Sequence, residues 1–178
     1  MNALAKRGLF VCTLLLATLT GCSSPANREA MTTGQLPISQ KHEVSVSVKT
    51  SGGADTGAMD SSNVSDADLK AAIEDSIAQN AVFKRIVQGT GGDYELTVSV
   101  ASLDKPIFGA SFTVNFEAGW TLTRLADQSI VYRKAIKSSH TATMGDAFVA
   151  VTRLRLAVEG AVKNNIAQGL KDISNLKL

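Results

Sequence analysis

Cys22 has the most specific chemistry in this sequence, because it ends a short leader with a basic start and an apolar centre. Two basic residues at 6–7 precede an almost uninterrupted apolar run over 9–19. Such a run is typical of a signal peptide and is too short to span a membrane, which takes about 20 residues. Thr20 and Gly21 provide the small side chains that a signal peptidase needs beside the bond it cleaves. These features are typical of the leader of an exported chain.

The four residues Leu19-Thr20-Gly21-Cys22 resemble the lipobox of bacterial lipoproteins. The resemblance implies that residues 1–21 are removed and that Cys22 carries three acyl chains, typically including palmitate. Two or more chains hold a protein stably on a membrane. Ser23, in place of an aspartate, implies transfer to the outer membrane with the protein facing the periplasm. An ordinary secretory leader with an accidental cysteine, or a buried N-terminal helix, are the alternative interpretations.

Other side chains that could do chemistry are dispersed. The two histidines, His42 and His140, have no neighbouring ligand pattern, so we expect solvent-facing side chains and no metal site. Ser138 or Ser139 with His140 and Asp146 could form a nucleophilic triad, but no Gly-x-Ser-x-Gly turn is present. Adjacent strand residues also point to opposite faces, which separates Ser139 from His140. We expect no enzymatic activity, no catalytic residues and no cofactor.

Two further clusters have structural explanations. Asp66 and Asp68 could pair for acid–base catalysis, but they follow Ser65, where they favour the N-terminus of a helix. The glycine-rich segment 89–92 could suggest a phosphate-binding loop. Such a loop leads from a strand into a helix, whereas this one leads from a helix into a strand. We expect a turn there.

Charge and cysteine content narrow the function further. The full chain has a formal net charge of +2, and the predicted leader removes two basic residues, leaving a neutral chain. This argues against nucleic-acid binding, which favours a basic surface. Cys12 leaves with the leader and Cys22 is acylated, so no disulfide can form. The exported chain must therefore be stabilised by a hydrophobic core.

The mature chain divides into two parts. Residues 22–41 are rich in proline, glycine and polar side chains and predict a flexible, acylated tether. Residues 42–178 predict a single domain. Its first strand starts at His42, where valines alternate with polar residues. A helix capped by Ser65 follows and is expected to end near residues 82–83.

Three further strands and a long helix complete the pattern. Alternation predicts strands over 94–101, 112–123 and 130–143, the last two joined by a short turn as an antiparallel hairpin. Apolar residues at helical spacing predict a helix over 151–173, with Arg153 among the residues off its apolar stripe. Gly160 and Gly169 in this helix either weaken it or allow close packing.

The element order β-α-β-β-β-α predicts an α+β fold. We expect a two-layer sandwich in which two helices cover one face of a four-stranded, mainly antiparallel sheet. The other sheet face would be polar and open to solvent.

This order, with the lipobox, resembles several small envelope lipoproteins. They are the curli-secretion lipoprotein, the amino-terminal part of the Tol-system propeller protein, and auxiliary lipoproteins of lipid-transport machines. The resemblance lies in Asp93–Val98 and Ala157–Ile166 and covers most of residues 42–176. It implies a non-catalytic accessory or scaffold protein that binds an envelope protein; it specifies neither this partner nor an oligomeric state.

Ile107 and Phe108 are the candidate partner-binding residues. They lie beside Pro106 and Gly109 in a loop between two strands, and exposed loops often carry function. They either cap the core or contact a partner protein or the bilayer. The alternative function is a lipid- or small-molecule-binding module with a cavity beside Trp120, Phe112 and the last helix.

Overall fold

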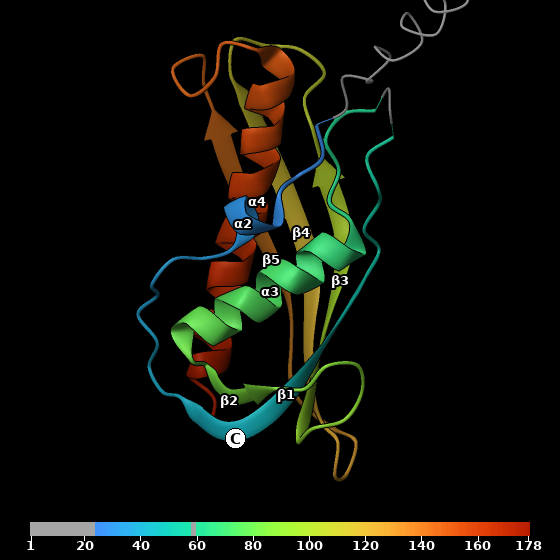
Figure 1. Cartoon of the computed structure of the whole chain (residues 1–178), viewed down its shortest axis with the longest axis vertical. Coiled ribbons are helices and arrows are strands. Elements are labelled where there is room, and N and C mark those ends of the chain that lie inside the picture. The colour runs from blue at the N-terminus through green and yellow to red at the C-terminus, as the bar shows by residue number, and fades with distance from the viewer. Residues whose placement is uncertain (1–23, 58–59) are drawn as a thin grey trace, which may run out of the picture.

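The computed structural model describes residues 24–57 and 60–178, which form one α+β domain (Figure 1). Cys22 and the leader lie outside the described residues. The elements are α2 (Arg28–Met31), β1 (His42–Ser51), α3 (Asp66–Asn80), β2 (Phe83–Ile86), β3 (Tyr94–Asp104), β4 (Phe112–Arg124), β5 (Ser129–Ala142) and α4 (Ala150–Ser174).

The sheet has five strands in the order β2-β1-β3-β4-β5, one more than the sequence predicts. The β3-β4 and β4-β5 pairs are antiparallel, and the predicted hairpin is confirmed. β1 pairs in parallel with both β2 and β3, so the sheet is mixed. The added strand is β2, which begins where the helix was expected to end. α3 stops at Asn80 because Ala81 takes a left-handed conformation with φ of 49°, and the chain then turns back beside β1.

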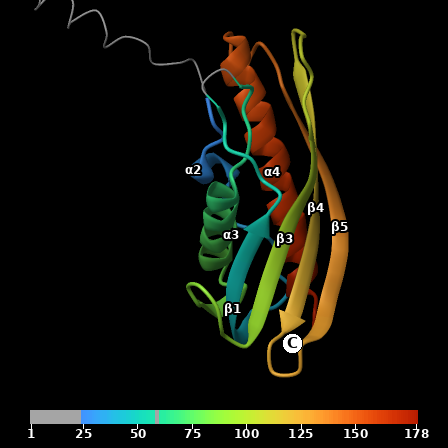
Figure 2. The same cartoon turned by 90° about the vertical axis from the view of Figure 1, so that its right-hand side faces the viewer.

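The helices cover one face of the sheet, as expected for a two-layer sandwich, and the two views in Figures 1 and 2 agree on this arrangement. Ser65 caps α3 by accepting a hydrogen bond from the backbone N–H of Asp68, as predicted. The core lies between the inward side chains of β1, β3 and β4 and the apolar stripes of α3 and α4. The opposite sheet face carries polar side chains.

The closest approach between α4 and the sheet is at Gly169. A Cβ atom there would lie 2.7 Å from three ring carbons of Trp120, so only glycine admits the indole without a shift. The fully buried Trp120 donates its Nε1–H to Oδ1 of Asn165 at 2.8 Å. The Asn165 amide in turn donates to the carbonyl of Ile136 at 2.8 Å. This glycine therefore serves close packing, the second of the two roles expected for it.

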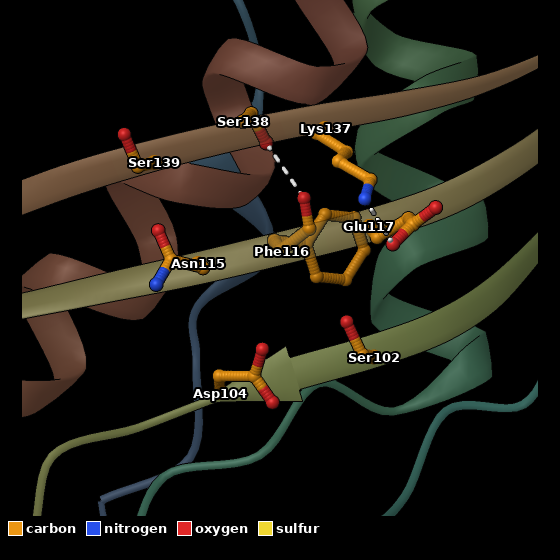
Figure 3. Close-up of a pocket in the computed structure, with 8 residues that line it drawn as sticks. All are labelled: Ser102, Asp104, Asn115, Phe116, Glu117, Lys137, Ser138 and Ser139. Atoms are coloured by element: carbon orange, nitrogen blue, oxygen red, sulfur yellow. Dashed lines mark hydrogen bonds and ion pairs between the residues drawn. The ribbon is translucent and has the colours of Figure 1, made fainter.

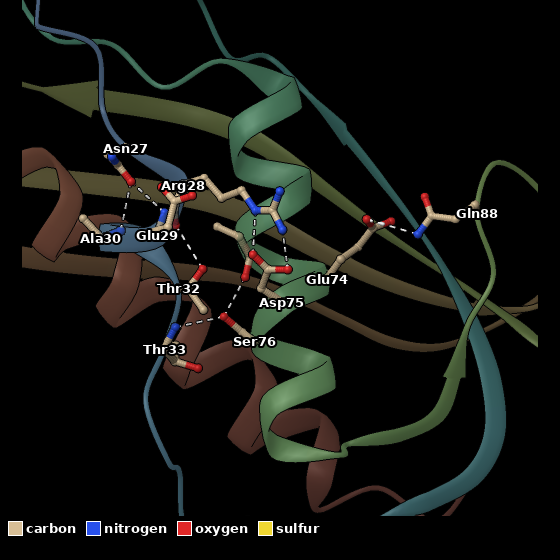
Figure 4. Close-up of polar contacts among 11 residues, drawn as sticks. Asn27, Arg28, Glu29, Ala30, Thr32, Thr33, Glu74, Asp75, Ser76 and Gln88 are labelled. Carbon is tan, nitrogen blue, oxygen red and sulfur yellow. Dashed lines mark hydrogen bonds and ion pairs between the residues drawn. The ribbon is translucent and has the colours of Figure 1, made fainter.

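The interpretation of residues 22–41 as a flexible tether is wrong for the described part, 24–41 (Figure 4). Asn27 caps the short helix α2, and the fully buried Met31 joins the core. Arg28 forms a two-bond ion pair with Asp75 of α3, with Nε–Oδ2 at 2.6 Å. Ser76 accepts a hydrogen bond from the N–H of Thr33 at 2.9 Å.

Two more contacts fix this segment. Asn80 of α3 accepts from the N–H of Leu36 at 2.7 Å. The buried Glu159 of α4 accepts from the N–H of Asn27 at 2.9 Å, and desolvation raises the pKa of its carboxyl. Partners on two helices thus order a segment whose composition alone suggested a coil.

Two other side chains differ from expectation. His42 is buried, its Nε2 lies 3.0 Å from the carbonyl oxygen of Ile173, and its ring packs on Phe83 with centroids 5.4 Å apart. His42 joins β1 to the end of α4, so it is not solvent-facing. Arg153 is also buried, although its spacing placed it off the apolar stripe.

Candidate functional site

Large exposed apolar side chains gather at one end of the molecule. Ile107 and Phe108 in the β3–β4 loop are 87% and 84% exposed, and Phe148 in the β5–α4 loop is 81% exposed. Met144 and Val149 of the same loop are half exposed. Both loops lie at the end where the described chain begins, opposite the C-terminus (Figures 1 and 2). We call these five residues the apolar end.

Arg153 joins the two loops of the apolar end. Its guanidinium donates to the carbonyl oxygens of Ala147 and Phe148 at 2.8 and 3.0 Å. It also donates to the carbonyl of Gly109 at 3.2 Å and lies over the Phe112 ring, 4.9 Å from the centroid. The loops are therefore held together by a buried cation while their apolar tips remain in solvent.

The start of the described chain is bonded to the same end. Ser62 donates its hydroxyl to the carbonyl of Ser24 at 2.5 Å. Lys105, two residues before Ile107, donates its ammonium group to the carbonyl of Ser62 at 3.0 Å and to Oδ1 of Asn63 at 2.5 Å. Burial lowers the pKa of Lys105. Through these bonds Ser24 is fixed beside the β3–β4 loop.

The exposure of Ile107 and Phe108 contradicts the interpretation that they cap the core. They are available for contact, as the alternative requires. Sequence reasoning missed Phe148 and its neighbours, although they are also large apolar residues beside glycine and aspartate in a loop. Phe148 and Val149 directly precede α4, so in the sequence they look like the start of its apolar stripe.

A second feature is a shallow depression of about 350 Å³ on the open sheet face, formed by β3, β4 and β5 (Figure 3). Asp104, Asn115 and Ser139 line it, together with Glu117 and Lys137, whose charged groups lie 3.5 Å apart. Small-molecule pockets are usually concave and mostly apolar. Seven of the eight residues that line this depression carry polar side chains, so it differs from such a pocket.

The side chains considered for a nucleophilic triad are brought together only in part. His140 and Asp146 line one surface depression, but neither Ser138 nor Ser139 lines it. Ser138 donates to the carbonyl of Ala161 at 2.8 Å, which ties β5 to α4. Asp146 accepts from the N–H and hydroxyl of Thr143 at 2.7 and 2.8 Å, and these bonds lower the pKa of its carboxyl. His140 is exposed and lies against Gly160. Asp66 and Asp68 occupy the first turn of α3, as expected.

Within residues 24–57 and 60–178, no group of three or more His, Cys, Asp or Glu side chains is placed to hold a metal ion. Over the same residues, none of the helices has the length and apolar character needed to cross a membrane. The space considered for a ligand cavity is filled at Trp120, which packs directly against α4.

Comparison with known proteins supports the fold. No protein-family model matches the chain, and no curated protein sequence is significantly similar to it. The structure of a DUF330 protein from Xanthomonas campestris has a TM-score of 0.55 at 12% identity and covers 80% of this chain and 87% of that one. A hypothetical protein from Chlamydia trachomatis has a TM-score of 0.51 at 5% identity, covering 74% and 98%. At these identities the likeness shows a shared α+β fold.

Solved structures named as lipoproteins are also similar, at lower scores. A minor lipoprotein from Acinetobacter baumannii has a TM-score of 0.48 at 8% identity and covers 73% of this chain and 91% of that one.

Proposed function

We propose that this chain is a lipid-anchored accessory lipoprotein of a Gram-negative envelope. Acyl chains on Cys22 hold it on the outer membrane, and the domain faces the periplasm and works by binding another protein. The observation that carries the proposal is the leader that ends in Leu19-Thr20-Gly21-Cys22. The ordered segment after it supports the proposal, because Ser24 is already bonded to the domain. The acylated residue would then be joined to the domain without a long linker.

Replacing Cys22 with serine is the test of the anchor. We expect radiolabelled palmitate to label the wild-type protein and the variant Cys22→Ser to remain unlabelled and move to the soluble periplasmic fraction. The leader contains a second thiol, Cys12, which provides the matched control. Cys12→Ser should keep both the label and the membrane fractionation. An unlabelled wild-type protein, or unchanged fractionation of Cys22→Ser, contradicts the proposal.

The choice of membrane has its own test at Ser23. The lipoprotein sorting rule retains chains with an aspartate after the acylated cysteine in the inner membrane. Wild type is therefore expected in outer-membrane fractions of a density gradient, and Ser23→Asp in inner-membrane fractions. A wild-type protein that fractionates with the inner membrane contradicts only the outer-membrane assignment; it does not contradict the lipid anchor.

Protein binding is assigned to the open face of the sheet. This face is polar, is free of helices, and bears the depression around Asn115 and Glu117. A photo-crosslinking residue at Asn115 is expected to capture one envelope protein in cells. The matched position is Gln79, which is exposed on α3 on the helical side. Equal capture from both positions, or none from Asn115, contradicts the assignment of this face.

A further inference from the structure

The apolar end and the chain's point of entry coincide. Ser24 is bonded through Ser62 to the loop of Lys105, and that loop carries Ile107 and Phe108. Arg153 joins the same loop at Gly109 to the loop of Phe148. Hydrogen bonds, together with the covalent segment from Lys105 to Gly109, therefore connect the first described residue to both loops of the apolar end.

Covalent geometry limits how far Cys22 can lie from this end. Two residues of fully extended chain span at most about 7 Å. An acylated Cys22 is therefore within about 7 Å of Ser24 along the chain, and Ser24 is fixed on the domain. A membrane that accepts the acyl chains must lie next to the apolar end.

The cations at this end are already bonded within the protein, and the exposed carboxylates of Asp60 and Asp104 lie beside Lys105 and repel an anionic surface, so the apolar side chains are the favourable contact. Lys105 is engaged by oxygens of Ser62 and Asn63, and Arg153 is engaged by three backbone carbonyls. The Asp146 carboxylate is satisfied by Thr143. Cations already bonded within the protein attract anionic lipid weakly. Transfer of exposed Phe and Ile side chains from water into lipid, in contrast, lowers the free energy of the system.

We propose that Ile107, Phe108 and Phe148 insert into the leaflet that holds the acyl chains of Cys22. The occupant of the apolar end is thus the bilayer surface, and the domain stands end-on against it with the open sheet face directed to the side. The inference rests on the proposed lipid anchor and adds a second, non-covalent contact that sets the orientation of the domain. Contact by apolar side chains also predicts that the docking persists at high salt, where surface charges are screened.

Depth-dependent quenching of tryptophan tests this orientation. The acylated protein is reconstituted in phosphatidylcholine vesicles with or without bromine on the acyl chains, which quench nearby indoles. Phe108→Trp and Phe148→Trp change side chains that are almost fully exposed, so both variants should fold. The native Trp120 is fully buried and supplies the constant background of the wild-type protein.

Ile130 provides the matched control. It is half exposed at the start of β5, at the opposite end of the molecule (Figure 1). We expect brominated lipid to reduce the emission that the new indole adds in Phe108→Trp and in Phe148→Trp, each measured separately, and to leave the emission added in Ile130→Trp unchanged. The difference should remain in 0.5 M salt, where the Debye length is only about 4 Å.

Equal quenching in Phe108→Trp and Ile130→Trp overturns the inference, and so does the absence of quenching in both Phe→Trp variants. A photo-crosslinking residue at position 108 that captures a protein, while the indole of Phe108→Trp stays unquenched in lipid, also overturns it. These outcomes are distinct from failure of the lipid anchor. In that case the protein carries no palmitate and does not fractionate with membranes, whereas here an acylated, membrane-bound protein would lack the expected orientation.

Discussion

Trp120→Ala is expected to lower the free energy of unfolding by about 3–5 kcal/mol, as large-to-small changes of buried aromatic residues usually do. Trp120 is fully buried against α4, so the change leaves a cavity between helix and sheet. It also leaves the Oδ1 atom of Asn165 without the indole N–H, its donor at 2.8 Å. Urea unfolding followed by circular dichroism measures the loss. A midpoint like that of the wild-type protein would falsify the packing described here.

Two glycines of α4 form a matched test of the same contact. In Gly169→Ala the new Cβ meets the indole at 2.7 Å, and the indole cannot move because Asn165 holds it. Overpacking of about 1–3 kcal/mol should outweigh the gain of about 1 kcal/mol in helix propensity. In Gly160→Ala the neighbour is the ring of His140, which is exposed and can turn into solvent. Gly160→Ala should therefore keep or raise stability, and an equal loss in both variants contradicts this explanation.

Elements with a strong local signal were predictable from the sequence. Ser65 starts α3 because its hydroxyl accepts from a backbone N–H three residues on, which a local motif encodes. The alternation of β4 runs from Phe112 to Leu122 with every second side chain buried. Such periodicity depends on one face being covered, whatever element covers it.

β2 was not predictable in the same way. It has four residues, and its burial pattern of one buried, two exposed and one intermediate residue does not alternate. It is a strand because His42 and Val46 of β1 pair with Phe83 and Ile86, some 40 residues away. Pairing between distant segments leaves no local pattern in so short a strand.

The segment after Cys22 was misread for a related reason. Pro37, Gly34 and polar neighbours are typical of a coil, and they do not form long regular structure here. The order comes from Ser76, Asn80 and Glu159, whose side chains bind its backbone from two helices. In the sequence these three read as ordinary polar residues.

Only part of the candidate site could be predicted from the sequence. Ile107 and Phe108 stood out because large apolar residues beside proline and glycine are unusual in a polar loop. Strand pairing places the ends of β3 and β5 on either side of the start of β4, which brings the loops of Phe108 and Phe148 to the same end of the sheet. Ser24 lies near them because Ser62 bonds both Ser24 and Lys105. Local sequence contains no such information, so the apolar end as a whole appeared only with the fold.

Arg153→Met is expected to lower the free energy of unfolding by about 2–4 kcal/mol. Methionine keeps an apolar stem for packing but removes the donors to the carbonyls of Gly109, Ala147 and Phe148. Hydrogen bonds to charged groups contribute about 1.5–3 kcal/mol each, and water can satisfy part of what is lost at these partly buried oxygens. Faster hydrogen exchange is expected in both loops of the apolar end, because the cation joins them. Urea unfolding and amide exchange measure the two effects.

Lys163→Met is the control, on the same helix. Lys163 is exposed to solvent. Substitutions of exposed side chains usually change the free energy of unfolding by less than about 0.5 kcal/mol, so this variant should lose little stability and leave loop exchange unchanged. If Arg153→Met instead unfolds like Lys163→Met, or loosens only one loop, the buried guanidinium does not join the two. The apolar tips would then move independently, and their insertion as one rigid end would lose its structural basis.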